Sequence, residues 1–236
     1  MSRMTKKIPS CTECQNNTKI ICALSASEKD DLSDTKSSNF YKKGQIVFYE
    51  GSQSHGLFCI YSGKVKLSKL GENGKEQVVR FAKTGDILGY RSIFSEEPYQ
   101  SSATVIEDSY ICQFSKDKFM SIMKTNPQLS RNTITLLSND LKQAEKSLLS
   151  IAQKTVKERI AEALLLLHST FGYFNDSTTL DVVLSRSEIA DTAGTTTETT
   201  IRTLALLNKE GFIVLEGKSI SIPDINKLSR VAGIFD

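Results

Sequence analysis

The spacing of apolar residues changes near Lys116, and that change sets the architecture of the chain. From Phe40 to Phe114 short alternating apolar runs are divided by glycine-containing turns, which is typical of an antiparallel sandwich or barrel. Beyond Lys116 the apolar spacing becomes that of helices. The sequence therefore predicts an α+β protein with an antiparallel β domain first and helices after it.

A long helix is predicted behind Pro127, and its apolar seam suits self-association. The seam advances by alternating steps of three and four residues over about three heptads, which is typical of a helix that pairs with a copy of itself. The alternative is a helix that packs only on its own β domain. The predicted dimer-interface residues are Ile134, Leu137, Leu141, Ala144, Leu148 and Ile151.

The 236 residues divide into four predicted parts. We expect a cysteine-bearing arm over residues 1–24, a β-rich sensor domain over 25–125, the long helix over 126–154 and a C-terminal domain over 155–236. In the last part we expect a helix ending near Gly172 and a strand over residues 180–184. A capping box from Ser185 to Glu188 should then open a short helix.

Composition excludes several classes of protein. No apolar run is long enough to cross a bilayer, and the N-terminal MSRMTKKIPS lacks the apolar segment of a signal peptide, so we expect a cytoplasmic protein without a membrane partner. With two histidines and no Ser/His/Asp, HExxH or phosphate-loop pattern, we do not expect an enzyme, and no catalytic residue is proposed.

The stretch TTTETTIRTLALLNKEGFI, which follows the turn at Ala193-Gly194, is predicted to be the second helix of a helix-turn-helix. Such a helix presents its N-terminal end to the major groove of DNA. Thr195 or Thr196 is a natural N-cap. One exposed face should carry Thr197, Glu198, Ile201 and Arg202, and the buried side should carry Ile189, Leu204 and Leu207.

That face has the donors and acceptors to read base pairs. Arg202 can donate two hydrogen bonds to guanine O6 and N7, and Glu198 can accept one from cytosine N4. Hydroxyls and amides at the helix start can reach phosphates. The alternative is a solvated helix with an ion pair between Glu198 and Arg202. The predicted DNA contacts are Arg186, Thr196, Thr197, Glu198, Thr199, Ile201, Arg202 and Lys218.

The residues after this helix predict a wing, because two short strands flank the turn Glu216-Gly217-Lys218. Lys218 is then placed to rest on the phosphate backbone. From Thr155 onward the chain has eight basic and eleven acidic residues. Because the net charge of this part is negative, a local basic surface rather than the overall charge must position the DNA. A winged helix-turn-helix is the predicted C-terminal domain.

With these elements in place, the chain resembles the CRP/FNR family of transcription regulators from about Leu24 to Leu228. Segments Phe40–Gly51, Leu57–Lys66 and Thr84–Gly89 are similar in order and spacing to that family's cyclic-nucleotide-binding-like β-roll. The long helix resembles its dimerisation helix, and Ser187–Arg202 resembles its helix-turn-helix. Thr197 stands where the cAMP receptor branch has arginine, and Ile201 stands where the FNR branch has serine.

The resemblance implies a homodimer on a palindromic double-stranded DNA site, one recognition helix per half-site, that contacts RNA polymerase and more often activates than represses. Glu198 and Arg202 occupy the base-reading positions. Ala144 replaces an acidic residue that the oxygen sensor of the family keeps in its dimer seam. We therefore expect a dimer that persists without ligand and switches by domain orientation.

The family's cyclic-nucleotide site is altered here. A glutamate is expected after Gly89, where this chain has Tyr90, and an arginine is expected where it has Ser101. A buried phosphate without its arginine would be an unpaired charge. cAMP is therefore not the expected ligand, although a small-molecule-responsive or ligand-free regulator stays open as an alternative.

The cysteines offer another sensor, because an iron–sulfur cluster takes four thiolates. Cys11-x-x-Cys14 is a tight pair, and Cys22 follows after seven residues. Cys112 resembles the remote ligand of the family's oxygen sensor FNR. In that sensor the gap that corresponds to Cys14–Cys22 has five residues. A 4Fe-4S cluster on Cys11, Cys14, Cys22 and Cys112 would make the protein responsive to redox state, oxygen or nitric oxide. Zinc, a thiol switch or no role are the alternatives, and Cys59 is expected to be a core thiol.

Overall fold

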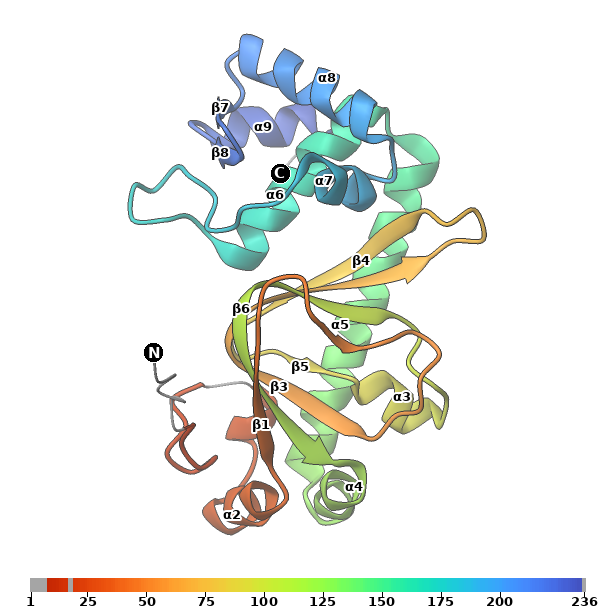
Figure 1. Cartoon of the computed structure of the whole chain (residues 1–236), viewed down its shortest axis with the longest axis vertical. Helices are drawn as coiled ribbons and strands as arrows, with labels where there is room; N and C mark the ends of the chain where they lie inside the picture. The colour runs from red at the N-terminus through yellow and green to blue at the C-terminus, as the bar shows by residue number, and fades with distance from the viewer. Residues whose placement is uncertain (1–7, 17–18, 235–236) are drawn as a thin grey trace. The chain divides into compact units, whose positions relative to one another are not determined.

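The computed structural model of the chain describes residues 8–16 and 19–234, and these form two compact units. The first contains residues 1–67 and 82–141, and the second contains residues 68–81 and 142–236. The boundary therefore falls inside the long helix, and the tip of one β-hairpin belongs to the second unit. Figure 1 shows the elements of both units along the chain.

The first unit is built around an antiparallel sheet. Its strands are β1 (Ser37–Tyr41), β2 (Ile46–Phe48), β3 (Gly56–Leu70), β4 (Glu76–Lys83), β5 (Ile87–Leu88) and β6 (Ser102–Ser115). The order is β1-β6-β3-β4, with β2 paired to β6 and β5 paired to β3. The register of β1 on β6 places Ser38 opposite Cys112. The antiparallel β domain expected from the alternating runs is thus confirmed.

One glycine of β3 is required for close approach between the two long strands. Gly63 has φ of 111°, and a Cβ built there would lie 2.0 Å from the Ser109 hydroxyl oxygen in β6. Any larger residue would collide with β6. Two long strands, β3 and β6, can therefore run past one another with little space between them at this point.

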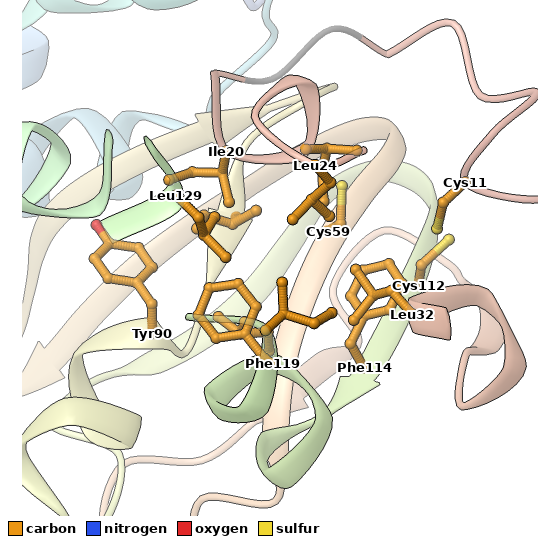
Figure 2. Close-up of a cluster of buried hydrophobic side chains, with 14 of the residues drawn as sticks. Cys11, Ile20, Leu24, Leu32, Cys59, Tyr90, Cys112, Phe114, Phe119 and Leu129 are labelled. Atoms are coloured by element: carbon orange, nitrogen blue, oxygen red, sulfur yellow. The ribbon is translucent and has the colours of Figure 1, made fainter. Parts of the chain in front are cut away.

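Helices cover one side of this sheet and make the larger of its two cores. These are α1 (Lys19–Cys22), α2 (Ala26–Asp34), α3 (Tyr90–Ser95), α4 (Lys116–Thr125) and the start of α5 (Pro127–Gln153). Figure 1 shows α2 and α4 side by side, and the two helices are in contact. Figure 2 shows their buried side chains converging, among them Leu32, Phe119 and Leu129, none more than 1% exposed.

The second core lies inside the β domain and is aromatic. Phe48 and Tyr99 stack with ring centroids 4.1 Å apart, and Phe58 packs against Phe48 at 5.3 Å. The Tyr99 hydroxyl donates to the Gly56 carbonyl over 3.3 Å. Large rings with a satisfied polar tip fill such an interior densely.

The second unit contains the C-terminal helices and a small hairpin. Its elements are α6 (Val156–Phe171), α7 (Arg186–Ala193), α8 (Thr197–Lys209), β7 (Val214–Glu216), β8 (Ser219–Ser221) and α9 (Ile225–Val231). Helix α6 is the central one and contacts α7, α8 and α9. Its fully buried Ile160 and Leu164 explain why its sequence is apolar around most of the helix.

Several boundaries agree with the sequence. Helix α5 ends at Gln153, and Thr155 caps α6 with the Glu158 capping box, so one helix ends and the next begins over these residues. Gly172 ends α6, and Ser185 with Glu188 forms the predicted capping box of α7. The antiparallel sheet, long helix and C-terminal helix-turn-helix together confirm the predicted fold class.

The prediction of a strand over residues 180–184 is wrong. Leu180 makes an isolated bridge with Tyr173, and Thr179 makes one with Ser221, but no continuous ladder follows. The alternation that suggested a strand is present, since Leu180, Val182 and Leu184 are buried. Burial of alternate residues, rather than pairing with another strand, therefore explains the pattern.

Candidate functional site

Helix α8 begins at a well-formed turn. Gly194 adopts the left-handed conformation with φ of 62°, and the Thr195 amide donates back to the Ala190 carbonyl over 3.0 Å. A residue with a Cβ is strained at such a position, which favours glycine. Thr196 then caps α8, because its hydroxyl accepts from the Thr199 amide over 3.2 Å. Thr196 rather than Thr195 is the N-cap.

The helix divides into a buried and an exposed side, as expected. Leu204 and Leu207 are fully buried, and so is Thr200, whose hydroxyl bonds to the Thr196 carbonyl. The opposite side is exposed at Thr197, Glu198, Ile201 and Arg202. Half of the Ile201 side chain is accessible, which leaves an apolar contact surface beside two charged groups.

Glu198 and Arg202 are not paired with each other. Within the part of the chain that the structure describes, no ion pair joins the two side chains. The i,i+4 pair that would make α8 an ordinary solvated helix is therefore not formed. Both charged groups extend from the exposed face into solvent, where a base edge could meet them.

The wing is held by side chains from the helices beside it. Strands β7 and β8 meet at the turn of Gly217 and Lys218, and Lys218 is exposed. Arg186 Nη2 donates to the Gly217 carbonyl over 3.0 Å, while its buried Nη1 has no hydrogen-bond partner. Asn208 Oδ1 accepts from the Leu215 amide over 3.0 Å. The half-buried Arg186, predicted as a DNA contact, thus also supports the wing turn.

Arg159 holds the helix-turn-helix turn in place, a role that the sequence did not reveal. From α6, its Nε donates to the Ala193 carbonyl over 2.9 Å and its Nη2 donates to the Gly194 carbonyl over 3.3 Å. Both carbonyls belong to the C-terminal end of α7, where donors are scarce. Nothing in the local sequence around Arg159 signals this contact, because its partners lie more than thirty residues away.

Comparisons with known proteins agree with this geometry. A cyclic nucleotide-binding domain model matches residues 38–126, and a Crp-like helix-turn-helix model matches residues 158–231. Electron transport regulator A of Shewanella oneidensis is 30% identical over 226 residues, which cover 94% of this chain and 90% of that protein. The chain belongs to the CRP/FNR family of transcription regulators.

Two further matches show the breadth of this family. The CRP-like cAMP-activated global transcriptional regulator of Mycobacterium tuberculosis is 32% identical over 81% of this chain and 86% of its own length. The structure of FixK2 from Bradyrhizobium japonicum superposes with a TM-score of 0.75 at 23% identity, covering 83% of this chain and 96% of that one. The CRP/FNR fold is shared across these proteins. The chain is a regulator and not an enzyme.

The cysteines of this CRP/FNR protein gather on the first unit. Cys11, Cys14, Cys59 and Cys112 all line one small cavity of about 20 Å³, room for roughly one water molecule. Figure 2 shows the side chains of Cys11 and Cys112 pointing toward one another. Cys22, by contrast, is exposed at the end of α1 and does not line this cavity.

Burial shifts the pKa of the two strand thiols that line the cavity, Cys59 and Cys112. Burial raises the pKa of the Cys59 thiol above its usual range, and the nearby cysteines add to the rise. Burial also raises the pKa of Cys112, against the effects of a hydrogen bond from Ser38 and the charge of Lys36. The Ser38 hydroxyl donates to Cys112 Sγ over 3.4 Å.

The four thiols are near one another without forming a preorganised metal site. Among residues 8–16 and 19–234, no three Cys, His, Asp or Glu side chains lie close enough together to hold a metal ion. The outer wall of the cavity is the arm, whose contacts include the Cys11 amide to the Ser33 hydroxyl over 2.8 Å and Asn16 Nδ2 to the Tyr61 carbonyl over 2.6 Å. Thiol donors suit iron–sulfur chemistry, but a cluster would need the arm to move outward.

The seam of α5 is largely exposed in the single chain. Ile134, Leu141 and Leu148 are each more than 60% exposed, whereas Leu137 packs against the core of its own unit. Apolar residues in a row at such exposure mark an association surface.

Within the described residues, no helix combines the length and apolar character needed to cross a membrane.

The position of the missing nucleotide-binding glutamate is occupied by a buried tyrosine. Tyr90 is 1% exposed, and its hydroxyl donates to the Asp140 carboxylate on α5. Gly89 before it has φ of 80°, and a Cβ there would lie 3.0 Å from the Gly56 carbonyl. This corner of the β domain is thus closed by protein side chains.

Proposed function

We propose that this CRP/FNR regulator binds a palindromic promoter site as a homodimer in the cytoplasm and contacts RNA polymerase there. The observation that carries the proposal is the exposed face of α8, with Glu198 and Arg202 unpaired to each other beside a half-exposed Ile201. Arginine suits guanine, glutamate suits the cytosine amino group, and an apolar side chain suits the thymine methyl. Lys218 and the capped start of α8 add phosphate contacts.

Selection of bound sequences from random DNA tests this proposal. With full-length protein, the expected product is an inverted repeat with a G·C pair in each half-site and centres about one helical turn apart. The Glu198→Ala and Arg202→Ala variants should each lose preference at one symmetry-related pair. A selected site without two-fold symmetry would contradict the dimeric part of the proposal.

We further propose that the cysteines, rather than a cyclic nucleotide, carry the signal. Three of the four cysteines predicted as ligands, Cys11, Cys14 and Cys112, line the same cavity, and the similar Electron transport regulator A is named for a role in electron transport. A bound iron–sulfur cluster would supply sensitivity to redox state, oxygen or nitric oxide. This chain's own part is to place thiol donors, keep them from bulk water and stabilise their charge through Lys36 and Ser38.

The test is anaerobic purification followed by iron and acid-labile sulfide analysis and an absorption spectrum. About four irons and four sulfides per chain are expected for a cubane cluster, and the Cys112→Ser variant should lose them. Iron-free protein with unchanged DNA binding would refute the cluster. It would leave the DNA-binding proposal intact and direct attention to small-molecule binding in the β-roll.

The residues at Tyr90 and Ser101 support a regulator that does not bind cAMP. Tyr90 fills the glutamate position and is bonded to Asp140, and Ser101 provides no positive charge for a phosphate. Saturating cAMP should therefore leave the melting temperature of the protein unchanged, whereas a bound ligand would raise it by linkage. A rise in Tm that saturates with cAMP would restore the small-molecule alternative.

A further inference from the structure

We infer that Arg159 is a positioning residue that joins the end of α5 to the helix-turn-helix and thereby fixes the spacing between the two DNA half-sites. This inference rests on the proposed dimer on a palindromic site and names the side chain that sets its geometry. The last turns of α5, from Lys142 onward, belong to the same compact unit as α6, α7 and α8. The contacts between these helices are therefore contacts within one unit.

Arg159 lies near the start of α6 and uses all three nitrogens of its guanidinium group. Nε donates to the Ala193 carbonyl over 2.9 Å, and Nη2 donates to the Gly194 carbonyl over 3.3 Å. Nη1 donates to the Lys154 carbonyl over 3.1 Å. Ala193 is the last residue of α7, and Lys154 follows the last residue of α5. One side chain thus joins the C-terminal ends of two helices.

An arginine suits this position because two helix C-termini meet there. Carbonyls at the C-terminal end of a helix lack intrahelical donors and carry partial negative charge. The guanidinium group supplies both hydrogen bonds and positive charge, and its planar shape holds the donors in fixed directions. A lysine has a single nitrogen on a flexible stem, so it cannot donate from the same three positions.

A second set of contacts joins the end of α5 to α6. Glu162, also on α6, accepts from the Ser150 hydroxyl and pairs with Lys154 Nζ over 3.1 Å. Ser150 is buried, and the side chains of Lys154 and Glu162 are 22% and 18% exposed. Charges that are largely shielded from water interact more strongly than surface pairs. The junction of α5 and α6 is therefore held by side chains as well as by the backbone.

Packing beside the turn agrees with these bonds. A Cβ built at Gly194 would lie 3.9 Å from Ile151 Cγ1, so the last residue of the apolar seam of α5 lies beside the turn that precedes α8. Ile151 is still 51% exposed, which leaves surface for a second copy of the chain. When two copies pair along α5, each Arg159 sets the position of its own α8 relative to the pair.

The geometry of this junction has a direct consequence for DNA. Two recognition helices about one helical turn apart meet the same face of the duplex, and each added base pair rotates the second half-site by about 35°. A rigid junction rejects a site with altered spacing, whereas a loose junction lets each α8 follow its half-site. Base reading within one half-site depends on Glu198 and Arg202 and not on the junction.

Binding to duplexes of different spacing tests this role. Full-length protein is titrated by fluorescence anisotropy with the selected palindrome, with the same palindrome lengthened by two central base pairs, and with a single half-site. The ratio of the first two dissociation constants measures discrimination of spacing. In Arg159→Lys this ratio should fall by about 10-fold, the order expected from the loss of a charge-assisted hydrogen bond. Preference for the matched base pair on the single half-site should be unchanged.

Lys157→Gln is the matched control, because it removes a positive charge from the same end of α6. Lys157 pairs with Glu210, which follows the last residue of α8, over 2.6 Å. Its loss leaves the bonds of Arg159 in place, so this control should discriminate spacing as wild type does.

Glu162→Ala is a second variant that keeps Arg159 unchanged. It removes the acceptor for Ser150 and Lys154, so it should also lower discrimination of spacing while base preference on the single half-site is retained. The test therefore does not depend on the folding of Arg159→Lys.

Three results would overturn the inference. Equal discrimination of spacing in wild type, Arg159→Lys and Glu162→Ala would do so and leave the proposed dimer intact. Base preference that falls together with discrimination of spacing would mean that Arg159 supports the fold of the domain and does not set spacing. A wild type that is indifferent to spacing would refute the proposed dimeric site, and the inference with it.

Discussion

At the scale of single residues, specificity and affinity for DNA should reside in different side chains. Arg202 lies on the exposed face of α8, so Arg202→Ala should cost about 1–3 kcal/mol on the selected site and relax preference at one base pair. Fluorescence anisotropy with matched and mismatched duplexes measures both effects. Equal loss on specific and random DNA would show that Arg202 does not read bases.

Lys218, exposed on the wing turn, provides the matched control at the same scale. Lys218→Ala should weaken binding to all sequences alike and lower the slope of log affinity against log salt by about one, because one phosphate contact is lost. A salt titration of the same duplexes gives this slope. A change in base preference in Lys218→Ala would place the wing in base recognition instead.

His168 should make the C-terminal domain sensitive to acid. Burial lowers the pKa of His168, whose ring lies 4.2 Å from that of Tyr173. The unfolded chain therefore binds a proton more readily, so this contribution to stability is present above the unfolded pKa of about 6.5 and is lost as pH falls below it. Urea unfolding at several pH values should show a weaker acid dependence in His168→Gln. An identical dependence in both proteins would assign it to other groups.

At the scale of elements, the helix-turn-helix depends on one backbone conformation. A Cβ at Gly194 would find its nearest neighbour, Gln77 Oε1, at 3.4 Å, so the space is adequate and the strain comes from the positive φ. Gly194→Ala should destabilise the protein by about 1–2 kcal/mol, measured by urea unfolding. Gly194→Asn is the control, because asparagine tolerates this conformation better. Equal loss in both variants would indicate a steric cause.

At the scale of the whole molecule, the exposed seam of α5 should hold two copies together. Leu141→Asp introduces a charge into that seam and should yield monomers that bind DNA weakly, as measured by light scattering at micromolar concentration. Gln143→Asp is the control, since this exposed residue lies off the seam. Wild type should stay dimeric after metal removal, because Ala144 adds no repulsion. A metal-free monomer would contradict that expectation.

Local sequence determined the elements of this protein because caps, turns and apolar period act within a few residues of one another. The capping box at Ser185, the turn at Gly194 and the exposed face of α8 were all predicted for this reason. Residues 180–184 were misread, since alternation reports burial but not whether a partner strand is present.

Tertiary structure decided which distant residues are in contact. The contacts of Arg159 with the turn, of Arg186 with the wing and of Tyr90 with Asp140 join residues from 31 to 50 positions apart. The cysteines show the same limit, because spacing favoured Cys22 while the fold brought Cys59 to the cavity. Sequence determines which faces are apolar or charged, but only packing of distant segments decides which faces meet.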